Sequence, residues 1–176
     1  GRTFRSQIHE DVDFWCRQRI NTAGERVLSA KRQMFSHVLE HYPCIIQELQ
    51  GIADGAGKSL DEIFWLNIFN AVSRVQAGEA CSAVIRRDAA GALHLGKTTD
   101  SDDEQRKVTL LRRVRDQGRD FYVLGWVGTV WVEVALTRSG LAIGANSAPA
   151  QPGQSASGIP QHFGAYPVLF EADNVD

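Results

Sequence analysis

The stretch Cys81-Ser-Ala-Val-Ile-Arg-Arg-Asp-Ala-Ala-Gly-Ala-Leu-His-Leu-Gly-Lys-Thr-Thr-Asp100 predicts a β-hairpin that begins with a cysteine. An alternating run leads to Arg87, the turn residues Asp88-Ala-Ala-Gly91 follow, and a second strand-like run starts at Leu93. Two short antiparallel strands bring the end of the stretch back to its start. We therefore expect the carboxylate of Asp100 to lie near the thiol of Cys81.

Cys81 follows the small-residue segment Gly78-Glu-Ala80, so cleavage of the Ala80–Cys81 bond would make it a new N-terminus. Such a residue carries a nucleophile and its base together. Its free α-amine, with a reference pKa of about 7.7 to 8.0, can take the thiol proton at neutral pH. Asp100 would then hold the new ammonium group, which is the orienting role of the third group in a triad. Asn146 ends a short apolar strand further on, and its amide is a candidate donor to an oxyanion.

Several motifs occur in a fixed order along the chain. They are Gly1-Arg-Thr-Phe-Arg-Ser-Gln-Ile8, Gln47–Gly57, Glu62-Ile63, Leu66-Asn67, Cys81-Ser-Ala-Val84, Leu95-Gly-Lys-Thr-Thr-Asp100, and Gly140-Leu-Ala142 with Asn146. In this order they resemble the acyl-coenzyme A:6-aminopenicillanic acid acyltransferase family, also described as peptidase family C45. Its members are N-terminal nucleophile (Ntn) hydrolases. The resemblance covers nearly the whole chain.

The resemblance implies an α+β fold: part of an Ntn-hydrolase-like αββα layered sandwich, preceded by a helical pro-region. Residues 1–80 would be the pro-region, or α segment. Residues 81–176 would be the first part of a β segment that continues beyond Asp176. The precursor would cleave itself between Ala80 and Cys81, and its two segments would act as partners.

The resemblance also implies roles for individual residues. Cys81 would be the nucleophile, Asp100 the partner of its amine, and Asn146 an oxyanion or substrate-orienting donor. Lys97 would bind substrate, because related bile salt hydrolases and penicillin V acylases carry a basic residue three places before the aspartate. The expected enzyme is an amidohydrolase or acyltransferase that takes a small acyl substrate from a linear amide or thioester. No cofactor is expected, although a coenzyme A thioester is a candidate substrate.

The chain departs from the family pattern at two places. Members commonly show Gly-Cys-Thr at the cleavage site and Asn-Trp-Asp around the acid, whereas this chain has Ala80-Cys81-Ser82 and Thr98-Thr-Asp-Ser101. The missing tryptophan removes a pocket wall, so these departures bear on the substrate more than on the reaction. They also motivate two other interpretations: a non-catalytic relative that acts as a binding module, and a protein with a redox-sensitive thiol at Cys81.

Each site residue also has an ordinary structural interpretation. A cysteine on an apolar strand is often a core residue. Asp100 can be a turn former, Asn146 can cap a strand end, and Lys97 can be a plain exposed lysine. Trp131, with its neighbour Trp126, can line a pocket for an acyl chain or fill the core.

Composition narrows the class of protein. The chain has 176 residues, 43% of them hydrophobic, which is long enough for one core, and its net charge of -2 gives no reason to expect a nucleic-acid partner. No apolar run approaches the roughly 18 to 20 residues that cross a bilayer. Cys16, Cys44 and Cys81 cannot all pair within the chain and match no zinc spacing. We therefore expect no membrane contact, no metal and a reducing, cytoplasmic location.

The period of the apolar residues changes at Cys81. Before it, apolar side chains recur every three or four residues, which predicts helices. After it, a period of two predicts a meander of antiparallel strands. In the first half we expect helices within residues 1–77 with a break at Pro43, including a helix over Ile45–Ile52 and a capping box over Ser59–Glu62. In the second half we expect hairpin turns at Asp116–Gly118 and Arg138–Gly140, with a strand over Val130–Thr137 between them. A loop over Pro149–Pro160 and a final helix over Phe163–Ala172 would follow.

Overall fold

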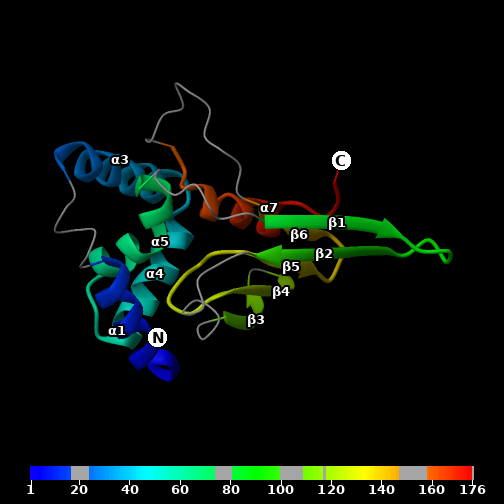
Figure 1. Cartoon of the computed structure of the whole chain (residues 1–176), viewed down its shortest axis with the longest axis horizontal. Coiled ribbons are helices and arrows are strands. Elements are labelled where there is room, and N and C mark those ends of the chain that lie inside the picture. Colours follow the sequence, from blue (N-terminus) through cyan, green and yellow to red (C-terminus); the bar gives the residue numbers. More distant parts are fainter. Residues whose placement is uncertain (17–23, 74–80, 100–108, 117, 147–157, 176) are drawn as a thin grey trace. The chain divides into compact units, whose positions relative to one another are not determined.

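The computed structural model of the chain describes residues 1–16, 24–73, 81–99, 109–116, 118–146 and 158–175. The chain divides into two compact units (Figure 1). Unit 1 comprises Gly1–Val75, Trp126–Trp131 and Ala150–Gly164, and unit 2 comprises Gln76–Gly125, Val132–Pro149 and Ala165–Asp176. The predicted boundary between residues 80 and 81 concerns cleavage of the chain and stays a prediction.

The first part of unit 1 is helical, as the apolar periodicity predicts. The elements of this part are the 3₁₀ turn η1 (Arg2–Phe4), α1 (Arg5–Asp11), the π-helical turn η2 (Val12–Cys16), α3 (Glu25–His41), α4 (Pro43–Ala56) and α5 (Leu60–Ser73). A later segment of unit 1 adds the 3₁₀ turn η3 (Gln161–Phe163). Pro43 starts α4, where its missing N–H leaves no helical bond unmade. The helix extends beyond the predicted Ile45–Ile52 in both directions. It ends only at Gly57, which has a φ of 70° and caps the helix in the left-handed conformation.

The capping box at the start of α5 is confirmed. The backbone N–H of Ser59 donates to Glu62 Oε2 over 2.9 Å, and the N–H of Glu62 donates to Ser59 Oγ over 3.2 Å. The bond from the Ser59 N–H favours the ionised carboxylate of Glu62. The pKa of Glu62 is therefore below its usual value, with the backbone N–H of Ser59 as the largest cause.

Asn67 on α5 fastens the segment Trp126–Trp131 to the helices of unit 1. Its buried side chain donates from Nδ2 to the carbonyl of Gly128 over 3.1 Å and accepts at Oδ1 from the N–H of Val130 over 2.9 Å. Its backbone carbonyl accepts from Trp131 Nε1 over 2.7 Å. These bonds satisfy polar groups that would otherwise be buried without partners.

The core of unit 1 combines side chains from the helices with side chains from the later segments. Trp131 is 1% exposed and stacks on His162, with ring centroids 3.8 Å apart and ring planes at 15°. Phe163 is fully buried and meets Phe64 of α5 edge-on, with ring centroids 6.3 Å apart. The structure thus favours the core interpretation of Trp131.

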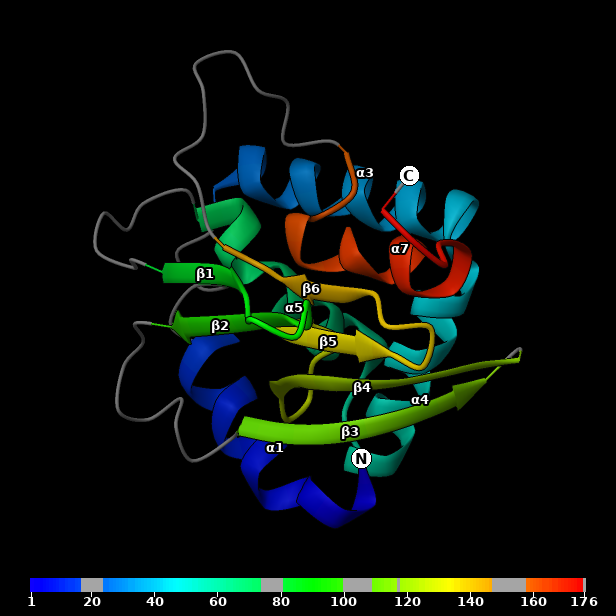
Figure 2. The same cartoon turned by 90° about the vertical axis from the view of Figure 1, so that its right-hand side faces the viewer.

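Unit 2 contains two sheets within its described residues (Figure 2). Its strands are β1 (Cys81–Arg87), β2 (Leu93–Thr99), β3 (Thr109–Asp116), β4 (Arg119–Trp126), β5 (Val134–Thr137) and β6 (Ala142–Gly144). The first sheet is the hairpin β1–β2, and the second has the order β3-β4-β5-β6. β5 begins at Val134 and not at the predicted Val130, because Val130 and Trp131 bond to Asn67 instead of to a neighbouring strand.

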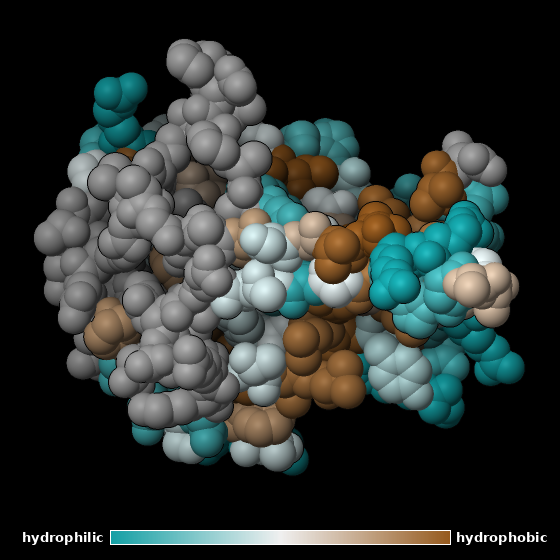
Figure 3. All heavy atoms as spheres, turned by 45° about the vertical axis from the view of Figure 1, so that its right-hand side comes forward, coloured by the Kyte–Doolittle hydropathy of each residue, from teal (hydrophilic) through white to brown (hydrophobic). Residues whose placement is uncertain are grey.

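The four-stranded sheet has apolar side chains on both faces. Phe121 on β4 is 1% exposed and meets Phe170 of helix α7 (Ala165–Glu171) edge-on, with centroids 5.4 Å apart. Tyr122, directly after Phe121, points to the opposite face, where it pairs with Leu136 of β5. Both remain exposed, as do apolar residues of the β1–β2 hairpin, and part of the apolar surface is visible in brown in Figure 3.

The chain is therefore a mixed α+β protein with helices and two antiparallel sheets, which confirms the predicted class at this level. The predicted final helix is split into η3 and α7, with Gly164 between them. Most of the predicted loop over residues 149–160 lies outside the described residues.

Candidate functional site

The turn of the β1–β2 hairpin sets which residues face one another. Asp88 Oδ1 accepts from the N–H groups of Ala90 and Ala92 over 2.9 Å each, and its Oδ2 lies 2.8 Å from His94 Nε2. These bonds hold the pKa of Asp88 below its usual value, with His94 as the largest cause. Gly91 has a φ of 88°, which suits glycine at this point of the turn. The turn chemistry and the strand pattern thus specify one register.

In that register Cys81 pairs directly with Thr99. Lys97 pairs with Ala83, so its side chain lies on the same face as those of Cys81 and Thr99, because alternate residues of a strand share a face. Lys97 Nζ lies 4.0 Å from Cys81 Sγ and also donates to Thr99 Oγ1. The predicted hairpin therefore brings a cation, and not only a hydroxyl, to the thiol.

Glu133 completes this cluster from the second sheet of unit 2. It immediately precedes β5, where its N–H donates to the carbonyl of Leu124 and its carbonyl accepts from the N–H of Ala145. Its Oε2 accepts from Lys97 Nζ over 2.6 Å and from Thr99 Oγ1 over 3.1 Å. We call Cys81, Lys97, Thr99 and Glu133 the thiol cluster.

Burial makes the thiol cluster different from a surface ion pair. The side chain of Lys97 is 1% exposed and that of Glu133 is 14% exposed. Cys81 is half-buried, so its sulfur is neither sealed in a core nor fully open to solvent. The Lys97 ammonium thus lies 4.0 Å from a sulfur that is only half-buried.

The structure places the other predicted site residues with mixed results. Asp100 and Ala80 lie outside the described residues, so their predicted roles stay predictions. Asn146 lies just after β6, is exposed, and makes no hydrogen bond to the thiol cluster among the residues described. The alternative that Lys97 is a plain exposed lysine is wrong, because its side chain is buried and bonded.

Sequence reasoning missed Thr99 and Glu133. Thr99 could have been found, since the predicted hairpin already places it opposite Cys81. Glu133 carries no comparable signal, because it reaches Lys97 through the arrangement of two sheets and not through local spacing.

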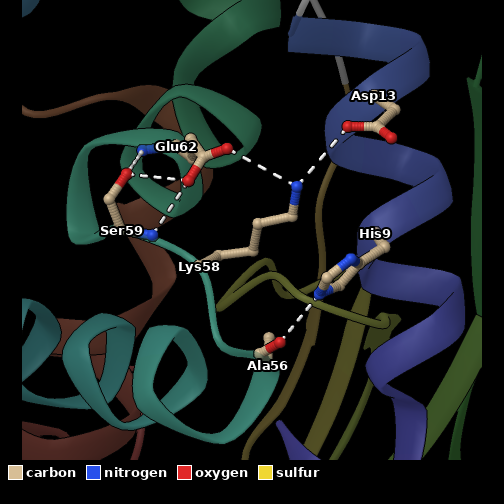
Figure 4. Close-up of polar contacts among 6 residues, drawn as sticks. All are labelled: His9, Asp13, Ala56, Lys58, Ser59 and Glu62. Atoms are coloured by element: carbon tan, nitrogen blue, oxygen red, sulfur yellow. Dashed lines mark hydrogen bonds and ion pairs between the residues drawn. The ribbon is translucent and has the colours of Figure 1, made fainter.

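A second polar cluster lies in unit 1, where α1 and η2 meet the junction of α4 and α5 (Figure 4). The ammonium of Lys58 lies 3.4 Å from Asp13 Oδ1 and 3.5 Å from Glu62 Oε1, and His9 Nε2 lies 2.8 Å from the carbonyl of Ala56. These contacts join α1 and η2 to α4 and α5, and the charge of Lys58 is balanced by those of Asp13 and Glu62. We therefore interpret this cluster as structural.

The described residues contain no group of three or more His, Cys, Asp or Glu side chains suited to hold a metal ion. His37 and His41 form a pair on α3 with ring centroids 4.5 Å apart, without a third ligand of this kind among those residues. None of the helices in the described part of the chain is both long and apolar enough to cross a bilayer.

The sequence matches no protein-family model and no curated protein.

Proposed function

We propose that the chain is a cysteine-type Ntn amidohydrolase or acyltransferase that activates itself by cleavage between Ala80 and Cys81. The observation that carries the proposal is the position of Cys81 at the first residue of β1, half-buried, with the Lys97 ammonium 4.0 Å from its sulfur. A buried lysine that contacts a thiol at a strand start supports a reactive cysteine and not a core residue.

The proposed self-cleavage is an acyl shift followed by hydrolysis. The Cys81 sulfur attacks the carbonyl carbon of Ala80, and the peptide nitrogen leaves with a proton, so that the Ala80 acyl group becomes a thioester. Water then attacks this thioester, releases the Ala80 carboxylate and returns the thiol. Cys81 is left with a free α-amine, which is the base that the second reaction needs.

The proposed turnover repeats the same chemistry on a small acyl substrate. The α-amine of Cys81 takes the thiol proton, the sulfur attacks the amide or thioester carbonyl, and the leaving amine or thiol departs with that proton. The acyl group remains as a thioester on the sulfur. Water or an acceptor amine then releases it. Asp100 and Asn146 keep the roles that the resemblance implies, as amine partner and oxyanion donor.

The four-stranded β3–β6 sheet of unit 2 supports the layered sandwich that the resemblance implies. Helix α7 packs on the face that carries Phe121, whereas Tyr122, Leu124 and Leu136 remain exposed on the other face. A sheet with apolar side chains on both faces is characteristic of a layered fold in which both faces are covered. A second sheet against Tyr122 and Leu136 would give the ββ interior of an αββα protein.

A reducing compartment is part of the proposal. A reactive thiol keeps its activity only while it is reduced. Cys44 and Cys81, the cysteines whose side chains the structure describes, are both free. A cytoplasmic enzyme is therefore the form that we propose.

Mass spectrometry of the purified chain tests self-cleavage. We expect the wild-type chain to yield two fragments separated between Ala80 and Cys81, and Cys81→Ala to remain intact. Cys44→Ala is the matched control, because Cys44 is a free and exposed cysteine in α4. It should cleave like the wild type.

Acyl transfer is tested on the same proteins. Incubation with short-chain and long-chain acyl thioesters should add an acyl mass to the fragment that starts at Cys81, and hydroxylamine should remove it. An uncleaved wild-type chain that forms no acyl adduct would refute the proposal. That result would support the binding-module alternative, whereas oxidative adducts at Cys81 without turnover would support the redox-sensitive thiol.

A further inference from the structure

We propose that Glu133 is a positioning residue, which holds the Lys97 ammonium against the Cys81 sulfur. A catalytic role for Glu133 rests on the proposed function. Its effect on the reactivity of the Cys81 thiol does not. It can therefore be tested without any turnover.

The donors of Lys97 are fully assigned by the thiol cluster. A lysine ammonium has three N–H groups and no acceptor. Two of them have strong oxygen acceptors, at Glu133 Oε2 over 2.6 Å and at Thr99 Oγ1. The third direction is the one in which Cys81 Sγ lies, at 4.0 Å. The two oxygens thus fix the orientation in which the remaining N–H meets the sulfur.

Burial explains why Lys97 needs Glu133 to stay there. An ammonium that is removed from water without a counter-ion costs several kcal/mol, so a lone lysine would either turn toward solvent or lose its proton. With its side chain 1% exposed, Lys97 does neither. The carboxylate of Glu133, which is 14% exposed, supplies the compensating charge.

Glu133 acts on the thiol through Lys97. The Lys97 ammonium attracts negative charge on the sulfur that lies 4.0 Å away. Among the described residues, Lys97 of β2 and Glu133 before β5 are the charged groups of this cluster. Glu133 therefore influences Cys81 by keeping Lys97 charged and in place.

The cluster forms only when the two sheets of unit 2 meet. Lys97 and Thr99 belong to the hairpin, whereas Glu133 belongs to the β3–β6 sheet. A second contact joins the same elements: a Cβ placed on Gly144 of β6 would lie 3.5 Å from Leu95 Cδ2 of β2. The reactivity of Cys81 consequently depends on residues that are distant in sequence and is established by folding of unit 2.

Site-resolved alkylation of Cys81 with iodoacetamide, followed by peptide mass spectrometry, tests the proposal. Glu133→Gln removes the counter-charge that keeps Lys97 buried and charged, so at about pH 7 we expect alkylation about tenfold slower than in the wild type. Lys97→Met leaves the carboxylate without its cation, and we expect alkylation about tenfold slower. Cys44 in the same chain is an internal standard, and its rate should not change.

The measurement at higher pH separates charge from access. Near pH 9.5 most ordinary thiols are ionised, so the rates of the variants and the wild type should converge. Rate differences that persist there would indicate a change in access to the sulfur and would overturn the proposal. Glu25→Gln removes the same charge from an exposed pair with Arg32 on α3, and it should leave the Cys81 rate within about twofold.

A double variant covers the case in which a single substitution prevents folding. Removing one partner of a buried pair is strongly destabilising, whereas replacing both by apolar residues is often neutral. Lys97→Met with Glu133→Leu should therefore fold and should alkylate more slowly than the wild type. Equal rates in this variant and the wild type would overturn the proposal. The proposed function is judged separately, because cleavage or acylation can fail while the order of alkylation rates holds.

Discussion

Asp11 is an acid whose ionisation opposes folding. It ends α1, where it is partly buried and next to Glu10. Burial first, and then the charge of Glu10, raises the pKa of Asp11 from 3.8 to about 6. The neutral form is therefore favoured in the folded state. Its contribution to stability is complete below pH 3.8 and is lost as the pH rises through 6.

Asp11→Asn should make the protein more stable than the wild type at pH 8 and leave it unchanged near pH 3.5. The shift in pKa corresponds to about 3 kcal/mol, which solvent screening of a partly exposed group reduces to about 1 kcal/mol. Urea denaturation at the two pH values measures the difference. Glu40→Gln, at an exposed position of α3, should show no such pH-dependent gain. A gain of equal size at both pH values would contradict the explanation.

Residue-level prediction from sequence succeeded where local spacing determines the geometry. The hairpin pattern around Asp88 and Gly91 gives the register that places Lys97 on the face of Cys81. The predicted proximity of Asp100 to Cys81 lies outside the described residues and stays a prediction. Glu133 could not be predicted, because no periodicity links it to Lys97 and only the packing of two sheets brings their side chains together.

Helix α4 contains two glycines in different surroundings. Gly51 is exposed, and a Cβ placed on it would meet nothing within 4 Å. Gly55 lies against the start of the chain, where a Cβ would come within 2.8 Å of Gly1 Cα and 2.9 Å of the Arg2 nitrogen. These atoms belong to the backbone and cannot move aside as a flexible side chain can. Gly55 thus allows close approach of the N-terminal backbone to α4.

Substitution of each glycine by alanine should separate helix propensity from packing. Gly51→Ala should stabilise the protein by about 1 kcal/mol, because alanine restricts the unfolded chain and favours helix. Gly55→Ala gains the same propensity but displaces η1, so it should be less stable than Gly51→Ala by at least about 1 kcal/mol. Thermal unfolding of the two variants makes the comparison. Equal stabilisation by both would show that the contact with η1 contributes nothing.

Element types were predicted better than element limits. The Ser59–Glu62 capping box predicted the start of α5, because both halves of the motif are local. The predicted end of α4 at Ile52 is too early, since the helix continues through Gly55 to Ala56. The start of β5 was also placed too early, because the tertiary bonds to Asn67 override the strand pattern at Val130.

The core of unit 1 is built from both sides of the proposed cleavage point. Phe64 and Asn67 come before Cys81 in the sequence, whereas Trp131 and Phe163 come after it. All four are buried; Phe64 packs against Phe163, and Trp131 donates a hydrogen bond to the carbonyl of Asn67. Cleavage between Ala80 and Cys81 would therefore leave these contacts intact.

If the chain cleaves itself, its two fragments should elute together from a sizing column under native conditions and separate only in denaturant. Phe163→Ala and Trp131→Ala should weaken their association by about 3 to 5 kcal/mol each, through the loss of buried aromatic packing. Phe14→Ala, at an exposed position of η2, is the control and should leave the fragments together. Separation of the wild-type fragments without denaturant would contradict this view of unit 1.

At the scale of the whole molecule, composition and periodicity predicted the α+β class because the change from a helical to a strand period is a property of the sequence itself. The division into units was not predictable in the same way. Segments Trp126–Trp131 and Ala150–Gly164 join the helices of unit 1 although they lie in the half of the chain with strand periodicity. The contacts of Asn67 with Val130 and of Phe64 with Phe163 show that these later segments pack with the helices.

The stack of Trp131 and His162 also provides unit 1 with an optical signal. Folding holds these two rings face to face. The emission of Trp131 therefore depends on whether the segments Trp126–Trp131 and Gln161–Phe163 lie against each other, and it can be followed without any added dye or label.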